Sequence, residues 1–60
     1  MTRQDVRYPG DLCRYMSRLV LVVEKVLDDY GGGYWCVCQE LGEPGTRKIR
    51  EEALVMVQPA

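Results

Sequence analysis

Residues 50–57 of this 60-residue chain have the sequence REEALVMV, in which two acids and an alanine stand before a run of apolar residues. Residues 50–54 have the pattern of one helical turn, and residues 55–57 favour a short strand because two of the three are β-branched. A helical turn before the last of several short strands is typical of small, strongly bent barrels. This segment therefore indicates an all-β fold, provided that the preceding chain supplies the other strands.

Four earlier segments have strand character: residues 11–15, 19–27, 34–41 and 46–50. The turn signals between them are strongest in DDYGGG at residues 28–33 and in GEPG at residues 42–45. Residues 19–27 are long enough for a helix, but their valines favour a strand. The chain is thus predicted to be all-β, a small barrel of five strands.

Apolar residues occupy both alternating sets of residues 19–27. This pattern predicts either a strongly bent strand or an outer face that another molecule covers. In the next strand, Trp35 and Val37 are predicted on the core side, and Cys36 and Cys38 on the other. The predicted core consists of Cys13, Tyr15, Val22, Trp35, Val37, Ile49, Leu54 and Val57.

The composition indicates a folded chain without enzymatic chemistry. Leu, Ile and Val make up 15 of the 60 residues, which predicts order rather than disorder. The chain has no His, and its thiols and hydroxyls have no base placed beside them in the sequence. We therefore predict no catalytic residues, no cofactor and no small-molecule substrate.

The cysteines Cys13, Cys36 and Cys38 are odd in number and lie on strand-like segments. We expect reduced thiols that act as small apolar side chains, rather than a disulfide framework. A zinc site needs four ligands, and the chain offers three thiols and no His. No metal site is predicted.

Eight basic residues stand against nine acidic ones, which gives a net charge of −1 and a pI near 5.2. This balance argues against general binding to a phosphate backbone. The basic residues gather towards both ends of the chain, however, and could share one face. The alternative function is therefore a nucleic-acid- or ribosome-associated barrel, with these candidate phosphate contacts: Arg14, Arg18, Arg47, Lys48 and Arg50.

Residues 9–15 (PGDLCRY) and residues 50–57 carry a resemblance to SH3-like small β-barrel proteins, many of them encoded by tailed bacteriophages. Such proteins open with a Gly-Asp-apolar-apolar-Arg pattern and finish with an acidic helical turn, a Leu and a pair of Val. The resemblance covers residues 9–57 and implies a barrel there, an N-terminal arm at residues 1–8 and a tail at residues 58–60. These motifs indicate a fold far more than an activity.

The chain departs from this family at Val20, where a Gly is frequent, and at Gln39, where an apolar or aromatic residue is frequent. The proline-rich ligand groove of signalling SH3 domains needs an acidic, aromatic loop between the first two strands. Residues 16–18 (MSR) supply neither property, so this mode of peptide binding is disfavoured.

The favoured function is a structural or interaction module that docks on a larger protein, in a virion or on a host protein, or that self-associates. Neither a signal peptide nor a membrane span is expected, because the longest apolar run, residues 19–23, has five residues. A virion or the host cytoplasm is the expected location. Trp35 is interpreted as a core residue or an interface anchor. The candidate partner contacts are Arg3, Arg7, Tyr8, Leu21, Tyr30 and Tyr34.

Overall fold

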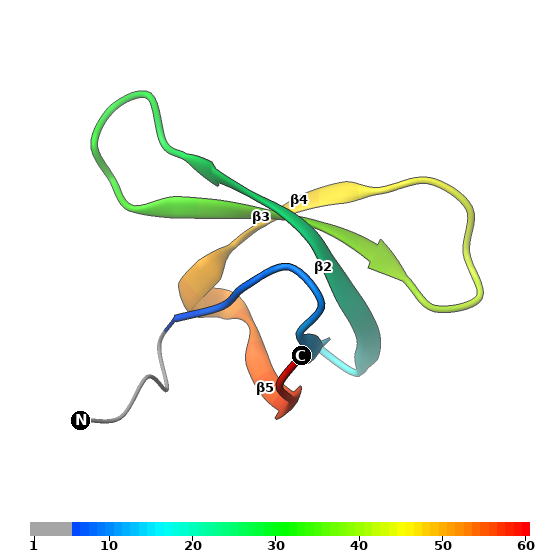
Figure 1. Ribbon diagram of the computed structural model, residues 1–60. Coiled ribbons are helices and arrows are strands. Elements are labelled where there is room, and N and C mark those ends of the chain that lie inside the picture. Colours follow the sequence, from blue (N-terminus) through cyan, green and yellow to red (C-terminus); the bar gives the residue numbers. More distant parts are fainter. Residues whose placement is uncertain (1–5) are drawn as a thin grey trace.

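Residues 6–60 are described by the computed structural model of the chain and form one sheet of five antiparallel strands (Figure 1). The strands are β1 (Leu12–Tyr15), β2 (Arg18–Leu27), β3 (Tyr34–Glu40), β4 (Arg47–Arg50) and β5 (Val55–Gln58). Their order across the sheet is β4-β3-β2-β1-β5, and the 3₁₀ turn η1 (Glu51–Ala53) connects the two edge strands. The predicted fold class, five short strands with a helical turn before the last, is confirmed.

The long strands β2 and β3 run through the middle of the sheet, and the loops at the two ends of β3 extend to opposite sides (Figure 1). A turn of two residues, Met16 and Ser17, joins β1 to β2, because Tyr15 pairs directly with Arg18. Met16 has a φ of 59°, a left-handed conformation that turns of this kind often require. Arg18, predicted in the connection, is thus the first residue of β2.

An extra residue in β2 determines which side chains point inward. β2 pairs Val22 with Cys38 and Glu24 with Val37, which are neighbours in β3. Val23 is therefore the extra residue and has no partner in β3. Such a β-bulge exchanges the two faces of the strand from that point onward. Even-numbered residues of β2 therefore face the core before the bulge and odd-numbered residues do so after it. The bulge does not account for Leu19 and Leu21, which precede it and alternate with the buried Val20 and Val22.

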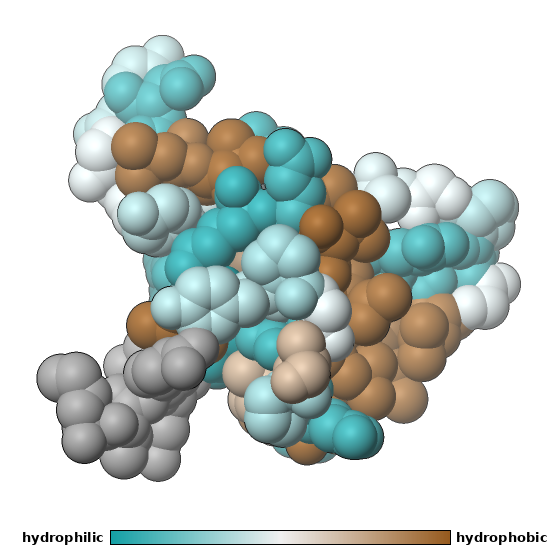
Figure 2. Space-filling view, viewed as in Figure 1, coloured by the Kyte–Doolittle hydropathy of each residue, from teal (hydrophilic) through white to brown (hydrophobic). Residues whose placement is uncertain are grey.

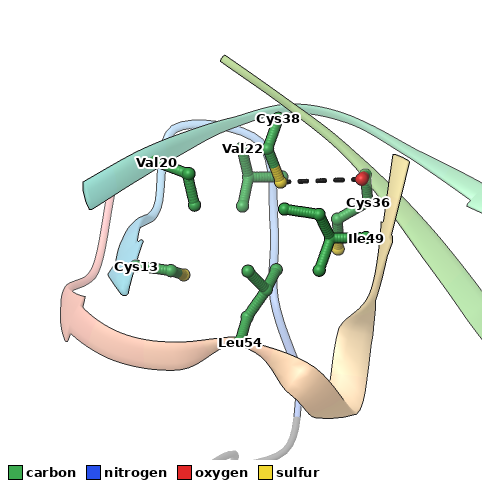
Figure 3. Close-up of a cluster of buried hydrophobic side chains, with 7 residues drawn as sticks. All are labelled: Cys13, Val20, Val22, Cys36, Cys38, Ile49 and Leu54. Carbon is green, nitrogen blue, oxygen red and sulfur yellow. Dashed lines mark hydrogen bonds between the residues drawn. The ribbon is translucent and has the colours of Figure 1, made fainter. Parts of the chain in front are cut away.

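The core of the barrel is formed by seven side chains, each at most 4% exposed, which point toward one another from all sides of the bent sheet (Figure 3). They are Cys13, Val20, Val22, Cys36, Cys38, Ile49 and Leu54. Tyr15 and Met56 pack against this cluster from its edge. The sequence-based core is confirmed at Cys13, Val22, Ile49 and Leu54, and Tyr15 is partly buried.

The predicted faces of β3 were wrong. Cys36 and Cys38 are fully buried, whereas Trp35 and Val37 lie on the outer side of the sheet. The interior of so small a barrel has room for thiols, and close packing leaves little space there for an indole that also needs a partner for its N–H. The thiols are free and buried, as predicted.

Val57, also predicted in the core, is 46% exposed. β1 pairs Leu12 with Gln58 and Cys13 with Met56, so Val57 falls at an irregularity of the β1–β5 ladder. Gln58, predicted in the tail, belongs to β5. Met56 packs against the core, so Val55 and Val57, which alternate with it along β5, point outward.

Residues 6–8, which the sequence analysis assigned to the arm, lie against the barrel. Arg7 is 5% exposed; its Nη2 donates to the carbonyl of Leu54 at 2.8 Å, and its backbone N–H donates to Glu51 Oε2 at 2.8 Å. Arg7, one of the predicted partner contacts, is therefore buried, and its guanidinium donates a hydrogen bond within the fold. Arg3 lies outside the described residues.

Asp11 forms hydrogen bonds with both ends of the described chain. Its carboxylate is buried and accepts the backbone N–H of Tyr8 at 2.7 Å and that of Ala60 at 2.8 Å. The backbone N–H of Gly10 also donates to the carbonyl of Val22, at 2.8 Å. The segment before β1 is thus held along β2 and beside the end of β5.

Candidate functional site

One outer side of the sheet carries a group of apolar side chains that the fold leaves exposed. β1 and β2 pair Leu12 with Leu21, and the N–H of Leu41 donates to the carbonyl of Leu19 at 3.1 Å. Leu19, Leu41 and Val55 are 42%, 52% and 50% exposed, and Leu12 and Leu21 are half-buried. We call these five residues the outer apolar face: Leu12, Leu19, Leu21, Leu41 and Val55.

The two-sided pattern of β2 creates this face. Val20 and Val22 point into the core, so Leu19 and Leu21, which alternate with them, point outward. Hydrophobic surface covers the side of the molecule that carries the start of β2 and the end of β3 (Figure 2). Of this face, only Leu21 is predicted from the sequence as a partner contact. The apolar residues in both alternating sets of residues 19–22 are the signal that also points to Leu19.

Arg14 lies in the middle of the outer apolar face. It is opposite Leu19 of β2 and opposite Val55 of β5, and it is exposed. Among residues 6–60, no carboxylate lies within 4.0 Å of its guanidinium, whereas Arg18 and Arg50 both form ion pairs. The face therefore combines apolar side chains with one cation that makes no ion pair within the described chain.

Trp35 is held on the outside of β3 by charged side chains. Its Nε1–H donates to Asp28 Oδ1 at 3.3 Å, and its ring centroid lies 4.8 Å from Arg50 Cζ and 5.3 Å from Lys48 Nζ. Arg50 also contacts Asp28 and donates to the carbonyl of Gly32. Of the two interpretations of Trp35, the core is wrong, and the indole is engaged by its own chain on the surface.

Tyr8 and Tyr34 cover a lysine at the other end of β2. Lys25 Nζ lies 2.8 Å from Glu51 Oε2, 4.4 Å from the ring centroid of Tyr34 and 5.0 Å from that of Tyr8. The side chains of Lys25 and Glu51 are only 17% and 12% exposed. The two tyrosines, both predicted as partner contacts, are 44% and 41% exposed and already bind an internal cation.

Tyr30 is the most exposed of the predicted partner contacts. It lies at the tip of the β2–β3 loop and is 95% exposed. Leu21, in contrast, belongs to the outer apolar face in the first half of β2, whereas Tyr30 lies in the loop that follows the last residue of that strand. The predicted partner contacts are therefore distributed over separate places rather than gathered in one site.

The candidate phosphate contacts are likewise distributed. Arg18 and Arg47 both contact Glu40, and Lys48 and Arg50 flank Trp35. Arg14 stands apart on the outer apolar face. Four of these five cations thus already have a carboxylate or an aromatic ring beside them, which reduces the positive charge available to a phosphate backbone.

The buried thiols are protected from ionisation. Burial raises the pKa of Cys36 to about 11 and that of Cys38 to about 12, and it also raises the pKa of Cys13. The Sγ of Cys38 lies 3.5 Å from the carbonyl oxygen of Cys36 and donates to it. Because the thiolate is the nucleophile and the metal ligand, these cysteines are placed to pack rather than to react.

Within residues 6–60, no group of three or more His, Cys, Asp or Glu side chains is arranged to hold a metal ion. The same part of the chain contains no helix with the length and hydropathy that crossing a membrane requires. Comparison of the chain with protein-family models, with curated proteins and with solved structures finds no match. The outer apolar face with Arg14 is therefore the candidate site, on the grounds of its geometry alone.

Proposed function

We propose that this protein is a non-enzymatic interaction module, a small barrel of the kind encoded by tailed bacteriophages, which docks on a larger protein of a virion or of the host. The outer apolar face is the docking surface. The observation that supports the proposal most is that Leu19, Leu41 and Val55 are about half exposed on one side of the sheet.

This exposure is informative because so short a chain needs its apolar residues for the core. Within residues 6–60, the buried core consists of seven side chains, three of them small thiols. Removing apolar surface from water stabilises by about 25 cal/mol per Å², so leaving several leucines outside forgoes a sizeable part of what a small domain can gain. Contiguous exposed apolar residues on small soluble domains often mark interaction surfaces.

The proposal predicts a face-specific response to a hydrophobic dye. The wild-type protein is expected to increase bis-ANS fluorescence, and Leu19→Glu is expected to abolish most of that increase, because a carboxylate in the middle of the face disrupts its apolar surface. Leu27→Glu is the matched control, since Leu27 is 60% exposed and lies at the far end of β2. Fluorescence titrations on the folded variants measure the difference.

Circular dichroism and thermal unfolding establish that both variants keep the barrel. Equal dye binding by the wild type and by Leu19→Glu would show that the outer apolar face is not the exposed hydrophobic surface. Equal losses of bis-ANS fluorescence in both variants would show that the dye binds exposed apolar side chains anywhere on the molecule and has no preference for this face. Either result contradicts the proposed docking surface.

A further inference from the structure

We infer that the partner of the outer apolar face is a different protein whose docking segment presents a carboxylate to Arg14 among apolar side chains. This inference rests on the proposed function and adds the chemistry of the partner. It follows from the position of one cation and from the way in which the other cations of the fold are used.

Arg14 differs from the other described cations, each of which has a carboxylate, a carbonyl or an aromatic ring beside it. Arg18 and Arg47 share the carboxylate of Glu40, and Arg50 contacts both Asp28 and Glu52. Lys25 pairs with Glu51, the Nη2 of Arg7 donates to a buried carbonyl, and Lys48 lies over Trp35. In the described chain, Arg14 has neither an ion pair nor an aromatic ring.

Arg14 lies between apolar residues of the two strands that flank β1. Leu19 lies directly across from it on β2, and Val55 lies directly across on β5. A protein that covers these neighbours removes water from the guanidinium as well. A buried cation without a compensating charge is strongly unfavourable, whereas a carboxylate can accept two parallel N–H bonds from a guanidinium. The partner must therefore supply an acid at this place.

A second copy of this chain does not supply the acid that Arg14 needs. The outer apolar face contains Leu and Val but no Asp or Glu. A face-to-face dimer with two-fold symmetry uses the same patch on both subunits. Such a dimer would bring two Arg14 guanidinium groups into one interface with no acid from either face, so a different chain fits better.

The experiment uses three blocked tripeptides as probes: N-acetyl-Leu-Glu-Leu-amide and its analogues with Gln or Lys at the central position. Binding to the full chain is followed by NMR, through the methyl signals of Leu19 and Leu21 and the Nε–H signal of Arg14. The Glu peptide is expected to bind about five- to tenfold more tightly than the Gln peptide, the range for a partly desolvated ion pair.

Variants assign that preference to Arg14. Arg14→Gln is expected to bind the Glu and Gln peptides equally, and Arg14→Glu is expected to prefer the Lys peptide. Lys48→Gln is the matched control, because Lys48 is an exposed cation that lies over Trp35 and outside the outer apolar face. This variant should keep the wild-type preference for the Glu peptide. Amide spectra of each variant report whether the fold is intact.

The outcomes separate this inference from the proposed function. Methyl shifts of equal size with all three peptides would overturn the carboxylate requirement and leave docking on the outer apolar face intact. An absence of methyl shifts with every peptide would contradict both. If Arg14 responds at low salt to a mixed-sequence DNA oligonucleotide and to none of the peptides, the inference is wrong and the nucleic-acid alternative is favoured.

Discussion

Glu51→Ala is expected to lower the free energy of unfolding by about 3 kcal/mol, the lower end of the range for breaking a buried ion pair. The carboxylate of Glu51 is only 12% exposed, lies 2.8 Å from Lys25 Nζ and accepts the backbone N–H of Arg7 at 2.8 Å. Its loss leaves the ammonium of Lys25 covered by the rings of Tyr8 and Tyr34 with no opposing charge.

Thermal unfolding monitored by circular dichroism measures the effect, and about 3 kcal/mol corresponds to a fall in Tm of roughly 12–24 °C for a domain of this size. Glu52→Ala is the matched control: Glu52 is the next residue, its side chain is 66% exposed, and it pairs only with Arg50 in the described chain. This control should change Tm far less.

A double-mutant cycle with Lys25→Met tests the cause. If the cost of Glu51→Ala comes from the unpaired ammonium, the double variant should be less destabilised than the sum of the two single variants. Additive effects, or equal falls in Tm for Glu51→Ala and Glu52→Ala, would show that the ion pair between Lys25 and Glu51 does not stabilise the fold.

The three thiols of the native protein are expected to react with 5,5′-dithiobis(2-nitrobenzoate) at pH 8 at least about a hundredfold more slowly than in denaturant. Burial raises the pKa of Cys36 to about 11 and that of Cys38 to about 12. At pH 8 these values leave roughly one thiolate in 1,000 and one in 10,000, against about one in four for an unperturbed thiol. Absorbance at 412 nm follows the reaction.

The same pKa shifts make the fold sensitive to alkaline pH. Since the folded-state pKa of each thiol is raised, the folded chain retains protons that the unfolded chain releases, and stability falls as pH rises from about 9 toward 11. A Cys38→Ala variant should lose part of this pH dependence. Rapid modification of all three thiols in the folded protein, or a pH dependence unchanged in Cys38→Ala, would contradict their placement in the core.

The fold class could be predicted from local signals because they agree with one another. The turn residues at 28–33 and 42–45, the acidic turn before residue 54 and the β-branched segments all indicate short antiparallel strands. The faces of the strands were harder to predict. The bulge at Val23 reverses the alternation within β2, and no residue type in that stretch marks a bulge in advance.

Hydrophobicity alone could not predict which side chains of β3 point into the core. Trp35 is the larger apolar side chain, but the interior volume favours Cys36 and Cys38. The indole is instead held on the surface by Asp28 and Arg50, which are 22 residues apart in the chain. Such long-range pairs depend on the register of the sheet, and the pattern of residues within one strand does not determine that register.

The candidate site was predictable in part. The apolar residues on both sides of residues 19–27 predict either a strongly bent strand or a face covered by another molecule, and Leu21 is one of the predicted partner contacts. Leu41 and Val55 join this face only because β2 and β1 bring the end of β3 and the start of β5 beside them. The central position of Arg14 among these residues depends on the same pairing.

Site-specific photocrosslinking tests most directly whether another protein covers the outer apolar face. The full chain carries p-benzoylphenylalanine at position 19, in that face, or at position 27, at the far end of β2, and is irradiated in its native cellular setting. We expect one discrete protein adduct from position 19 that is absent from position 27. The same adducts from both positions, or none from position 19, would contradict the account of this barrel as a docking module.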